Sequence, residues 1–330
     1  GEGILSKGPF IIKDIKALSP GQQVWGKFLI LEKMHKKTKD GKDMHNLTIG
    51  DTSGDLNVVV WDNCSIAGAA EVGQVIGLLG DVGVFANRVQ ITAKRIKTLE
   101  EDPLPYLRVA AGLDELKQSF EEILALVEDA SMQKLLARIL TPEKKEKFYQ
   151  TPAAKKIHHN YAGGLLQHTV TVARMCIQVC QMYKDLNCDL LITGAVLHDV
   201  GKMDEYSIKV APEYTVAGRL IGHIVMGSEL ITGTVAQIRA EGEDFSEELE
   251  WMLKHMILSH HGSLEFGSPV KPLFPEAMVL HIMDDLDARM FIYFNKINED
   301  EGEDPFFTPY DSFFAQNFFK YRYPADKQED

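Results

Sequence analysis

The hydrophobic pattern of this chain changes its period near residue 100. Before that point apolar residues come in short alternating runs, the period-two pattern typical of half-buried strands. After it they recur with the 3.6-residue spacing of amphipathic helices. A multi-domain chain is therefore expected, with an all-β domain followed by an all-α domain. The five runs that indicate strands are residues 24–33, 45–51, 56–62, 75–82 and 88–96.

The order of these runs favours one kind of β domain. Small residues fill 63–73, between the third and fourth runs. Five strands with a break after the third are the layout of an oligonucleotide-binding (OB) barrel, although an unrelated small barrel or sandwich is the alternative. We predict an N-terminal OB-fold barrel over residues 1–100, a helical linker region over 101–150 and a helical bundle over 151–330.

An acidic, proline-containing stretch at 100–109 leads into the helical part. Thr141 precedes a proline, which is a typical helix start because a threonine side chain caps the first turn and proline fits its first position. The helices are expected at 113–129, 131–140, 141–149, 165–183, 190–199, 217–240, 246–259 and 275–297.

The charge is distributed unevenly. The net charge is −13, yet residues 1–100 hold 13 Lys and Arg against 11 Asp and Glu, and the remainder holds 22 against 37. Lysines are concentrated in the loop between the first two strands. In an OB barrel this loop borders the oligonucleotide groove, in which aromatic side chains stack on bases. A merely solvated loop and core aromatics are the alternatives. The nucleic-acid-binding candidates are Phe28, Lys36, Lys37, Lys39, Lys42 and Trp61, with Phe85 as a further aromatic.

Composition also indicates the cellular compartment of the protein. No apolar stretch reaches membrane-spanning length, and the start of the sequence has no signal-peptide core. Four cysteines in 330 residues are too few for a disulfide framework. We therefore expect no membrane partner and a cytoplasmic location, where thiols stay reduced.

Histidine and aspartate recur on separate predicted helices. A lone histidine on an apolar helix is usually a core residue with one hydrogen-bond partner. Several imidazoles and carboxylates in one bundle are costly to bury unless a cation or close pairing compensates them. The residues of this pattern are His168, His198, Asp199, His223, His260, His261 and Asp284.

The order of His168, the His198-Asp199 pair and Asp284 resembles the HD superfamily of metal-dependent phosphohydrolases. Together with a preceding OB barrel, "NYAGGLLQHT" and "LSHHG" make the chain similar to the YhaM-type 3′–5′ exoribonucleases. The resemblance implies a first metal ion held by His168, His198, Asp199 and Asp284. It implies a second ion shared by Asp199 and held by His223, His260 and one of His261 or His255.

Phosphodiester hydrolysis explains this set of residues. A phosphodiester is anionic and repels hydroxide, and two divalent ions both activate water and clamp the attacking and leaving oxygens. The resemblance implies Mn²⁺; mixed histidine and carboxylate ligands also suit Fe²⁺, Co²⁺ and Zn²⁺, and Mg²⁺ less well. Asp199 and Lys202 are the catalytic candidates, and His159 and Arg289 the phosphate contacts. The alternatives are a solvent-exposed lysine for Lys202, a surface or capping role for His159 and an ordinary salt bridge for Arg289. Asp287 is expected behind the metal ligands or near substrate.

The sequence thus predicts a cytoplasmic metal-dependent 3′–5′ exoribonuclease acting on single-stranded RNA, with DNA as a further substrate class. One alternative is a phosphodiesterase for a small or cyclic nucleotide with a regulatory barrel. Another is a nucleic-acid-binding protein whose histidine-rich site is structural. Association into a homo-oligomer stays open. So does the role of the aromatic tail at 304–330, which packs on the core, forms an interface or contacts substrate.

Overall fold

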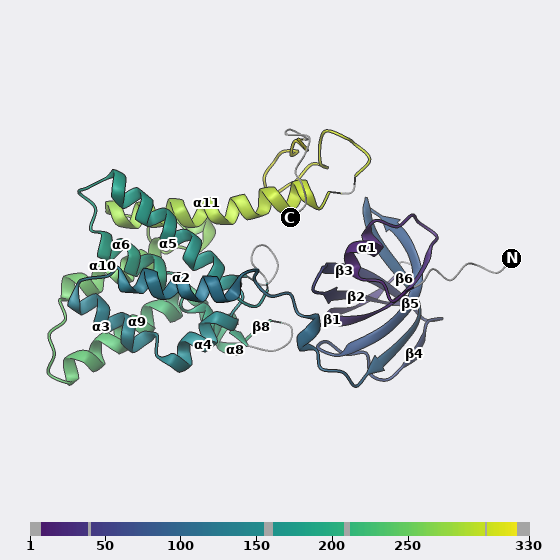
Figure 1. Cartoon of the computed structure of the whole chain (residues 1–330), viewed down its shortest axis with the longest axis horizontal. Helices are drawn as coiled ribbons and strands as arrows, with labels where there is room; N and C mark the ends of the chain where they lie inside the picture. Colours follow the sequence, from purple (N-terminus) through teal and green to yellow (C-terminus); the bar gives the residue numbers. More distant parts are fainter. Residues whose placement is uncertain (1–7, 39–40, 155–160, 208–211, 301, 322–330) are drawn as a thin grey trace. The chain divides into compact units, whose positions relative to one another are not determined.

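The computed structural model describes residues 8–38, 41–154, 161–207, 212–300 and 302–321. Its internal contacts divide the chain into two units, Gly1–Arg108 with Ile292–Asp330 and Val109–Phe291. Figure 1 shows mainly β-strands in the first and mainly helices in the second. The predicted domains 1–100, 101–150 and 151–330 differ from this division. The helices between 113 and 150 bury apolar residues in the core of the second unit, and residues 292–330 join the first unit.

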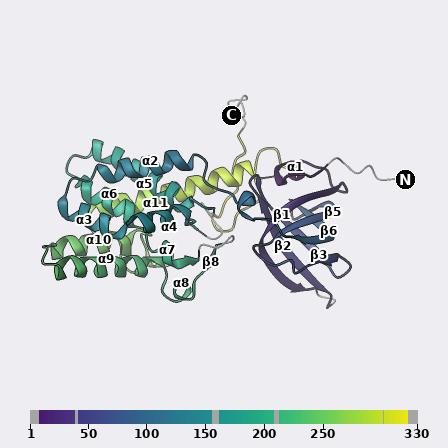
Figure 2. The same ribbon diagram turned by 60° about the horizontal axis from the view of Figure 1, so that its bottom comes forward.

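The first unit contains a closed barrel, which confirms the predicted OB-type fold. The main strands are β1 (Gln23–Lys37), β2 (Asp43–Asp51), β3 (Gly54–Trp61), β5 (Val75–Phe85) and β6 (Arg88–Leu99). They follow the order β3-β2-β1-β5-β6, and parallel pairing of β3 with β6 closes the sheet (Figure 2). A short strand that the sequence did not predict, β4 (Ser65–Ala67), runs parallel to β6.

The barrel closes around a core that includes one predicted RNA contact. Phe28 is 1% exposed and lies among the buried aliphatic residues of the barrel. The absence of a side chain at Gly26 makes room for it, since a Cβ there would lie 2.5 Å from the Phe28 ring. The prediction that Phe28 stacks on bases is therefore wrong, because neither face of its ring is open to a nucleotide. A short helix, α1 (Ile12–Lys16), adds Ile12 and Ile15 to this core.

The second unit is a helical bundle, as predicted. Side chains of Asp129, Thr141, Asn187, Thr215 and Ser246 accept hydrogen bonds from the first turns of five of its helices, which satisfies amides that a helix leaves unpaired. Its helices are α2 (Leu113–Ala125), α3 (Ala130–Ile139), α4 (Pro142–Gln150), α5 (Gly164–Met182), α6 (Cys188–Leu197), α7 (Lys202–Glu205), α8 (Val216–Ile221), α9 (His223–Ala240), α10 (Glu247–Ser259) and α11 (Pro275–Asn298). The second unit also contains a short helical turn, η2 (Leu264–Phe266), and a small hairpin of β7 (Tyr206–Ser207) with β8 (Glu213–Tyr214). A further helical turn, η1 (Leu104–Tyr106), lies in the first unit.

One predicted helix, 217–240, is broken in two. Gly222 lies between α8 and α9 with φ of 80° and ψ of 154°, a backbone conformation that glycine adopts far more readily than other residues. The apolar spacing continues across the break, so periodicity alone did not reveal it. As a consequence His223 becomes the first residue of α9.

The end of α11 and the residues that follow it belong to the first unit. The rings of Phe314 and Phe318 pack edge-on against Tyr293, with centroids 5.8 and 4.7 Å away. Lys296 pairs with Asp311 at 2.7 Å. The described part of the tail, residues 304–321, thus packs on the end of α11, while other aromatics in that part, such as Phe313 at 74% exposure, stay open.

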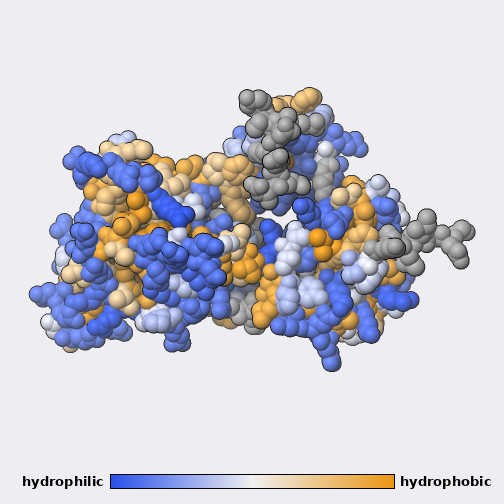
Figure 3. All heavy atoms as spheres, in the orientation of Figure 1, coloured by the Kyte–Doolittle hydropathy of each residue, from blue (hydrophilic) through white to orange (hydrophobic). Residues whose placement is uncertain are grey.

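The surface is mainly hydrophilic with apolar patches, on the face that Figure 3 shows. Within the part of the chain that the structure describes, no helix combines the length and the apolar character needed to cross a membrane.

Candidate metal centre

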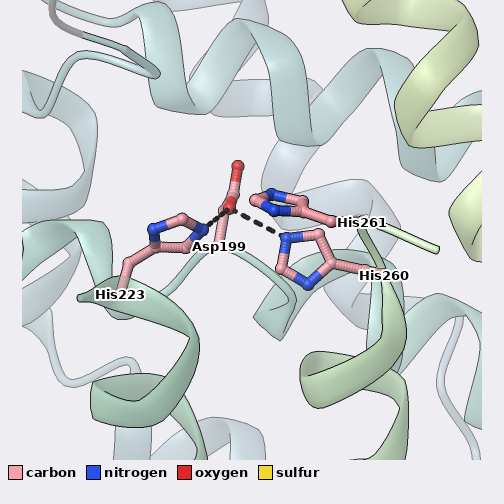
Figure 4. A group of neighbouring side chains, drawn as sticks. All are labelled: Asp199, His223, His260 and His261. Carbon is pink, nitrogen blue, oxygen red and sulfur yellow. Dashed lines mark ion pairs between the residues drawn. The ribbon is translucent and has the colours of Figure 1, made fainter. Parts of the chain in front are cut away.

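Two groups of possible metal ligands lie in the second unit and share one residue. Within each group, one ligand atom per residue lies within 4.8 Å of all the others. The first group is His168, His198 and Asp199, and the second group is Asp199, His223, His260 and His261. Figure 4 shows the second group, whose imidazoles converge on the Asp199 carboxylate.

Helix ends bring these residues together. His168 lies in α5, while His198 and Asp199 directly follow the last residue of α6. His223 begins α9, and His260 directly follows α10. Because the chain turns after α6, the adjacent side chains of His198 and Asp199 can meet at one point, which a continuing helix would not allow.

The two oxygens of Asp199 face different groups. Its Oδ2 lies 3.4 Å from His198 Nε2 and 3.6 Å from His168 Nε2. Its Oδ1 lies 3.3 Å from His223 Nε2 and 3.5 Å from His260 Nε2. A single carboxylate therefore connects the two groups, as a ligand shared by two ions would.

Asp284, from α11, lies beside the first group. Its Oδ1 is 2.9 Å from His168 Nε2 and 3.7 Å from His198 Nε2. With Asp199 Oδ2, these atoms bring two carboxylates and two imidazoles to one point, a donor set that suits a divalent transition-metal ion.

The second group contains polar atoms that lack hydrogen bonds. Asp199 Oδ1, His223 Nε2 and His260 Nε2 are buried and make no hydrogen bond to any residue that the structure describes. Their mutual distances fall within ion-pair range, but the geometry of a hydrogen bond is not met. Each such buried group costs about 1–3 kcal/mol. A cation between them would remove that cost, so these residues fit a metal ion.

The other ring nitrogen of each histidine has a hydrogen-bond partner. His198 Nδ1 lies 2.7 Å from the Ala195 carbonyl, and His260 Nδ1 lies 2.6 Å from the Ile257 carbonyl. Both carbonyls belong to last turns of helices, where main-chain acceptors lack helical partners. Such contacts fix the ring and its tautomer and direct Nε2 toward the centre.

His261 Nδ1 likewise lies 2.8 Å from a carbonyl, that of Phe266. For the rings of His168 and His223 a carboxylate takes this role. His168 Nδ1 lies 2.6 Å from Asp287 Oδ2, and His223 Nδ1 lies 3.2 Å from Glu205 Oε1. The contact of Glu205 was missed in the sequence analysis. In the sequence Glu205 is seen only as an acidic residue three positions after Lys202. Its contact with His223 depends on the fold, which the sequence pattern does not show.

Comparison with known proteins agrees with this geometry. A family model described as "HD domain" matches residues 165–289, and one described as "OB-fold nucleic acid binding domain" matches 33–99. A third, for a helicase family, matches 128–187 and overlaps the first.

The chain is also similar over most of its length to curated proteins named 3′–5′ exoribonuclease YhaM. It is 32% identical to that of Oceanobacillus iheyensis over 278 residues, which are 82% of this chain and 85% of the relative. It is 32% identical to that of Bacillus subtilis over 285 residues, which are 84% of this chain and 88% of the relative. The chain belongs to the YhaM family. The resemblance predicted from its motifs is thereby confirmed.

Electrostatics give this YhaM-family centre ionised carboxylates. Burial acts to raise the pKa of Asp199, but Lys202 and His198 outweigh it and hold that pKa well below its usual range. The pKa of Asp284 is likewise lowered, because His168 and His198 outweigh its burial. Both groups therefore carry their charge at neutral pH.

Burial and neighbouring charges shift the pKa of three of the histidines in opposite directions. Burial lowers the pKa of His260, and burial together with the neighbouring His260 lowers the pKa of His261 to about 3. Burial acts in the same direction on His168, but hydrogen bonds with Asp284 and Asp287 outweigh it and raise its pKa to about 10. His260 and His261 are thus neutral at pH 7, the form in which imidazole binds metals, whereas His168 carries a proton until a cation displaces it.

Lys202 and Arg289, two further predicted residues, have different environments. Lys202 is 6% exposed, and its Nζ donates to Asp199 Oδ2 at 2.7 Å. The alternative of a solvent-exposed lysine is therefore wrong. Arg289 donates from Nε to Asp285 Oδ2 at 2.6 Å, an exposed pair one turn apart on α11. Its contact is the ordinary salt bridge that the sequence left as an alternative.

His255 is absent from both groups. Its Nε2 accepts a hydrogen bond from the Leu273 amide at 3.1 Å. This nitrogen is engaged with the main chain, so the prediction that His255 is a metal ligand is corrected. His261 is the member of the predicted pair that joins the second group.

The lysine candidates lie on the barrel. Lys36 and Lys37 are exposed at the end of β1, and Lys42 is exposed just before β2. Trp61 is half-buried at the end of β3, and Phe85 is 72% exposed at the end of β5. Two candidates, Lys39 and His159, lie outside the described residues.

Proposed function

We propose that this chain is a metal-dependent 3′–5′ exoribonuclease that hydrolyses the phosphodiester bonds of single-stranded RNA. The observation that carries the proposal is the Asp199 carboxylate, whose two oxygens face two separate groups of imidazoles. Membership of the YhaM family and the match of an OB-fold nucleic-acid-binding model support the substrate class.

In this proposal His168, His198, Asp199 and Asp284 hold one divalent ion. Asp199, His223, His260 and His261 hold the other. Mixed imidazole and carboxylate donors favour Mn²⁺ over Mg²⁺, which prefers oxygen ligands. When bound, two such ions lower the pKa of water and stabilise charge on the attacking and leaving oxygens.

The residues of the chain supply the rest. Asp199 and Asp284 stay ionised because of the cationic groups around them. The neutral rings of His260 and His261 offer lone pairs without first losing a proton. Lys202 is a buried cation next to the shared carboxylate, and in that place it stabilises negative charge that develops on the phosphate.

The barrel binds the RNA in this proposal. Lys36, Lys37 and Lys42 attract the sugar–phosphate backbone, and the exposed ring of Phe85 and the half-buried Trp61 stack on bases. None of these contacts requires a 2′-hydroxyl, so single-stranded DNA is a second substrate.

The four cysteines are free thiols, in keeping with a cytoplasmic enzyme. Self-association is proposed through exposed aromatics of the tail such as Phe313.

One experiment tests polarity and metal dependence together. An oligoribonucleotide labelled at its 5′ end is incubated with the purified chain, first stripped with a chelator and then resupplied with Mn²⁺. We expect a ladder that shortens stepwise, and only a labelled mononucleotide from the same RNA labelled at its 3′ end. Intact RNA in both arms, with hydrolysis of a cyclic dinucleotide offered alongside, would instead favour the small-nucleotide alternative.

A further inference from the structure

Glu205 is a buried carboxylate that belongs to neither group of metal ligands. It ends the short helix α7 and is 6% exposed, although glutamate is rarely buried unless it has a partner. The partner that the structure gives it is His223, the residue that begins α9. A residue outside the metal groups therefore contacts one of their members directly.

One oxygen of Glu205 fixes His223 in two ways. Glu205 Oε1 accepts from the His223 main-chain amide at 3.1 Å and lies 3.2 Å from its ring Nδ1. Helix α9 has Gly222 at its N-cap and no side-chain cap hydrogen bond, so its first amides lack the usual local acceptor. Glu205 serves as that acceptor from a distant segment and holds the imidazole of the same residue.

The position of Glu205 is itself tightly set. Its carbonyl oxygen accepts from the Thr215 amide at 2.9 Å. Gly218, in α8, lies so close that a Cβ there would be 2.2 Å from the same oxygen. Because α7 and α8 pack main chain against main chain at this point, Glu205 has little freedom to move away from His223.

The consequence concerns the free nitrogen of His223. With Nδ1 held by Glu205, Nε2 is the atom that faces Asp199 Oδ1, at 3.3 Å. If the ring could rotate freely, Nε2 would not be held toward Asp199, and the entropy lost on ordering the ring would weaken ion binding. The first group does not depend on Glu205, since His198 is oriented by a carbonyl and His168 by Asp287.

We propose that Glu205 is a positioning residue that sets the affinity of the second group for its cation and leaves the first group unaffected. The proposal rests on the two-ion function given above. Loss of a carboxylate that orients a metal-binding histidine lowers metal affinity by about 10- to 100-fold. We expect this loss for one ion of the two.

The test measures metal binding without substrate. Stripped wild-type protein, Glu205→Ala, Glu205→Gln and the control Asp204→Asn are each titrated with MnCl₂ in a calorimeter. Asp204 neighbours Glu205 on α7, but its side chain is 60% exposed and pairs with Lys147 at 2.7 Å. We expect two ions for wild type and for Asp204→Asn, and one ion weakened about 10- to 100-fold in Glu205→Ala. Glu205→Gln keeps an acceptor oxygen without the charge, so its loss should be smaller.

Other outcomes would overturn the inference. If both ions bind Glu205→Ala as they bind wild type, Glu205 does not position His223. Equal weakening of both ions, with a lowered melting temperature in both Glu205 variants, would identify a structural role only. If the wild-type chain itself fails to bind two ions, it is the proposed function that fails, and the two failures are thus distinguishable.

Discussion

The metal centre and the basic loop of the barrel use charge in opposite ways. In the centre Asp199 is 2% exposed and lies within 4 Å of four histidine nitrogens. On the barrel Lys36, Lys37 and Lys42 are exposed. Buried charges act through fixed geometry at low local dielectric, whereas exposed charges are screened and add up without a fixed arrangement. Single substitutions should therefore have large effects in the centre and small, salt-dependent effects on the barrel.

The largest effect is expected for Asp199→Asn. This change keeps the shape of the side chain but removes the charge that both metal groups share. We predict a fall in kcat of more than about a thousandfold, equivalent to about 4 kcal/mol of transition-state stabilisation. Single-turnover cleavage of labelled RNA measures it, and RNA affinity from anisotropy should stay near the wild-type value. Turnover within tenfold of wild type would contradict the shared-ligand assignment.

The difference between the regions also explains what the sequence could predict. The period of the apolar residues predicted the strands and most helices, because burial on one face leaves a local pattern. Gly222 breaks 217–240 without interrupting that pattern, so the start of α9 at His223 was not predicted. Residues of the motif could be named as a set, but the contact between Glu205 and His223 arises only when α7 and α9 meet.

Errors in the assignment of single residues have a different physical origin. Alternation shows that Phe28 lies on one face of a strand, but it does not show whether that face is inside or outside. In the same way, His255 could be grouped with His260 and His261 by proximity in sequence. Only the fold shows that the His255 ring accepts from the Leu273 amide instead.

Lys202→Met is expected to have the next largest effect. Methionine keeps most of the buried volume and removes the cation that lies 2.7 Å from Asp199 Oδ2. We predict a fall in kcat of about 100-fold, the usual cost of losing one group that stabilises developing charge. Metal content, measured by mass spectrometry, should remain at two ions. The exposed Lys184→Met serves as the control. An unchanged kcat would mean that Lys202 only neutralises Asp199 in the ion-free protein.

A triple change of Lys36, Lys37 and Lys42 to Ala tests the other side of the comparison. We predict a severalfold rise in KM for RNA at moderate salt and no change in kcat. The slope of log affinity against log salt should decrease by up to about 2, since each lost contact to a single strand contributes about 0.7.

Its matched control changes three exposed lysines of the second unit to Ala, namely Lys144, Lys184 and Lys271. An equal change in salt slope for this control would show that total charge, and not the loop, attracts the RNA. If the change of Lys36, Lys37 and Lys42 to Ala lowered kcat, the loop would affect the chemical step as well as RNA binding. The contrast between a centre that acts through geometry and a loop that acts through charge would then be wrong.

Phe28→Leu should have the smallest effect on activity. The ring is 1% exposed and Gly26 leaves room for it, so a smaller side chain loosens the barrel core and lowers the free energy of unfolding by about 1–2 kcal/mol. RNA affinity and kcat below the melting temperature should match the wild type. Phe85→Ala, at a ring 72% exposed, should do the reverse and weaken RNA binding without changing the melting temperature. Weaker RNA binding by Phe28→Leu at unchanged stability would mean that the barrel core opens to the nucleotide, and burial would then no longer separate structural from RNA-binding aromatics.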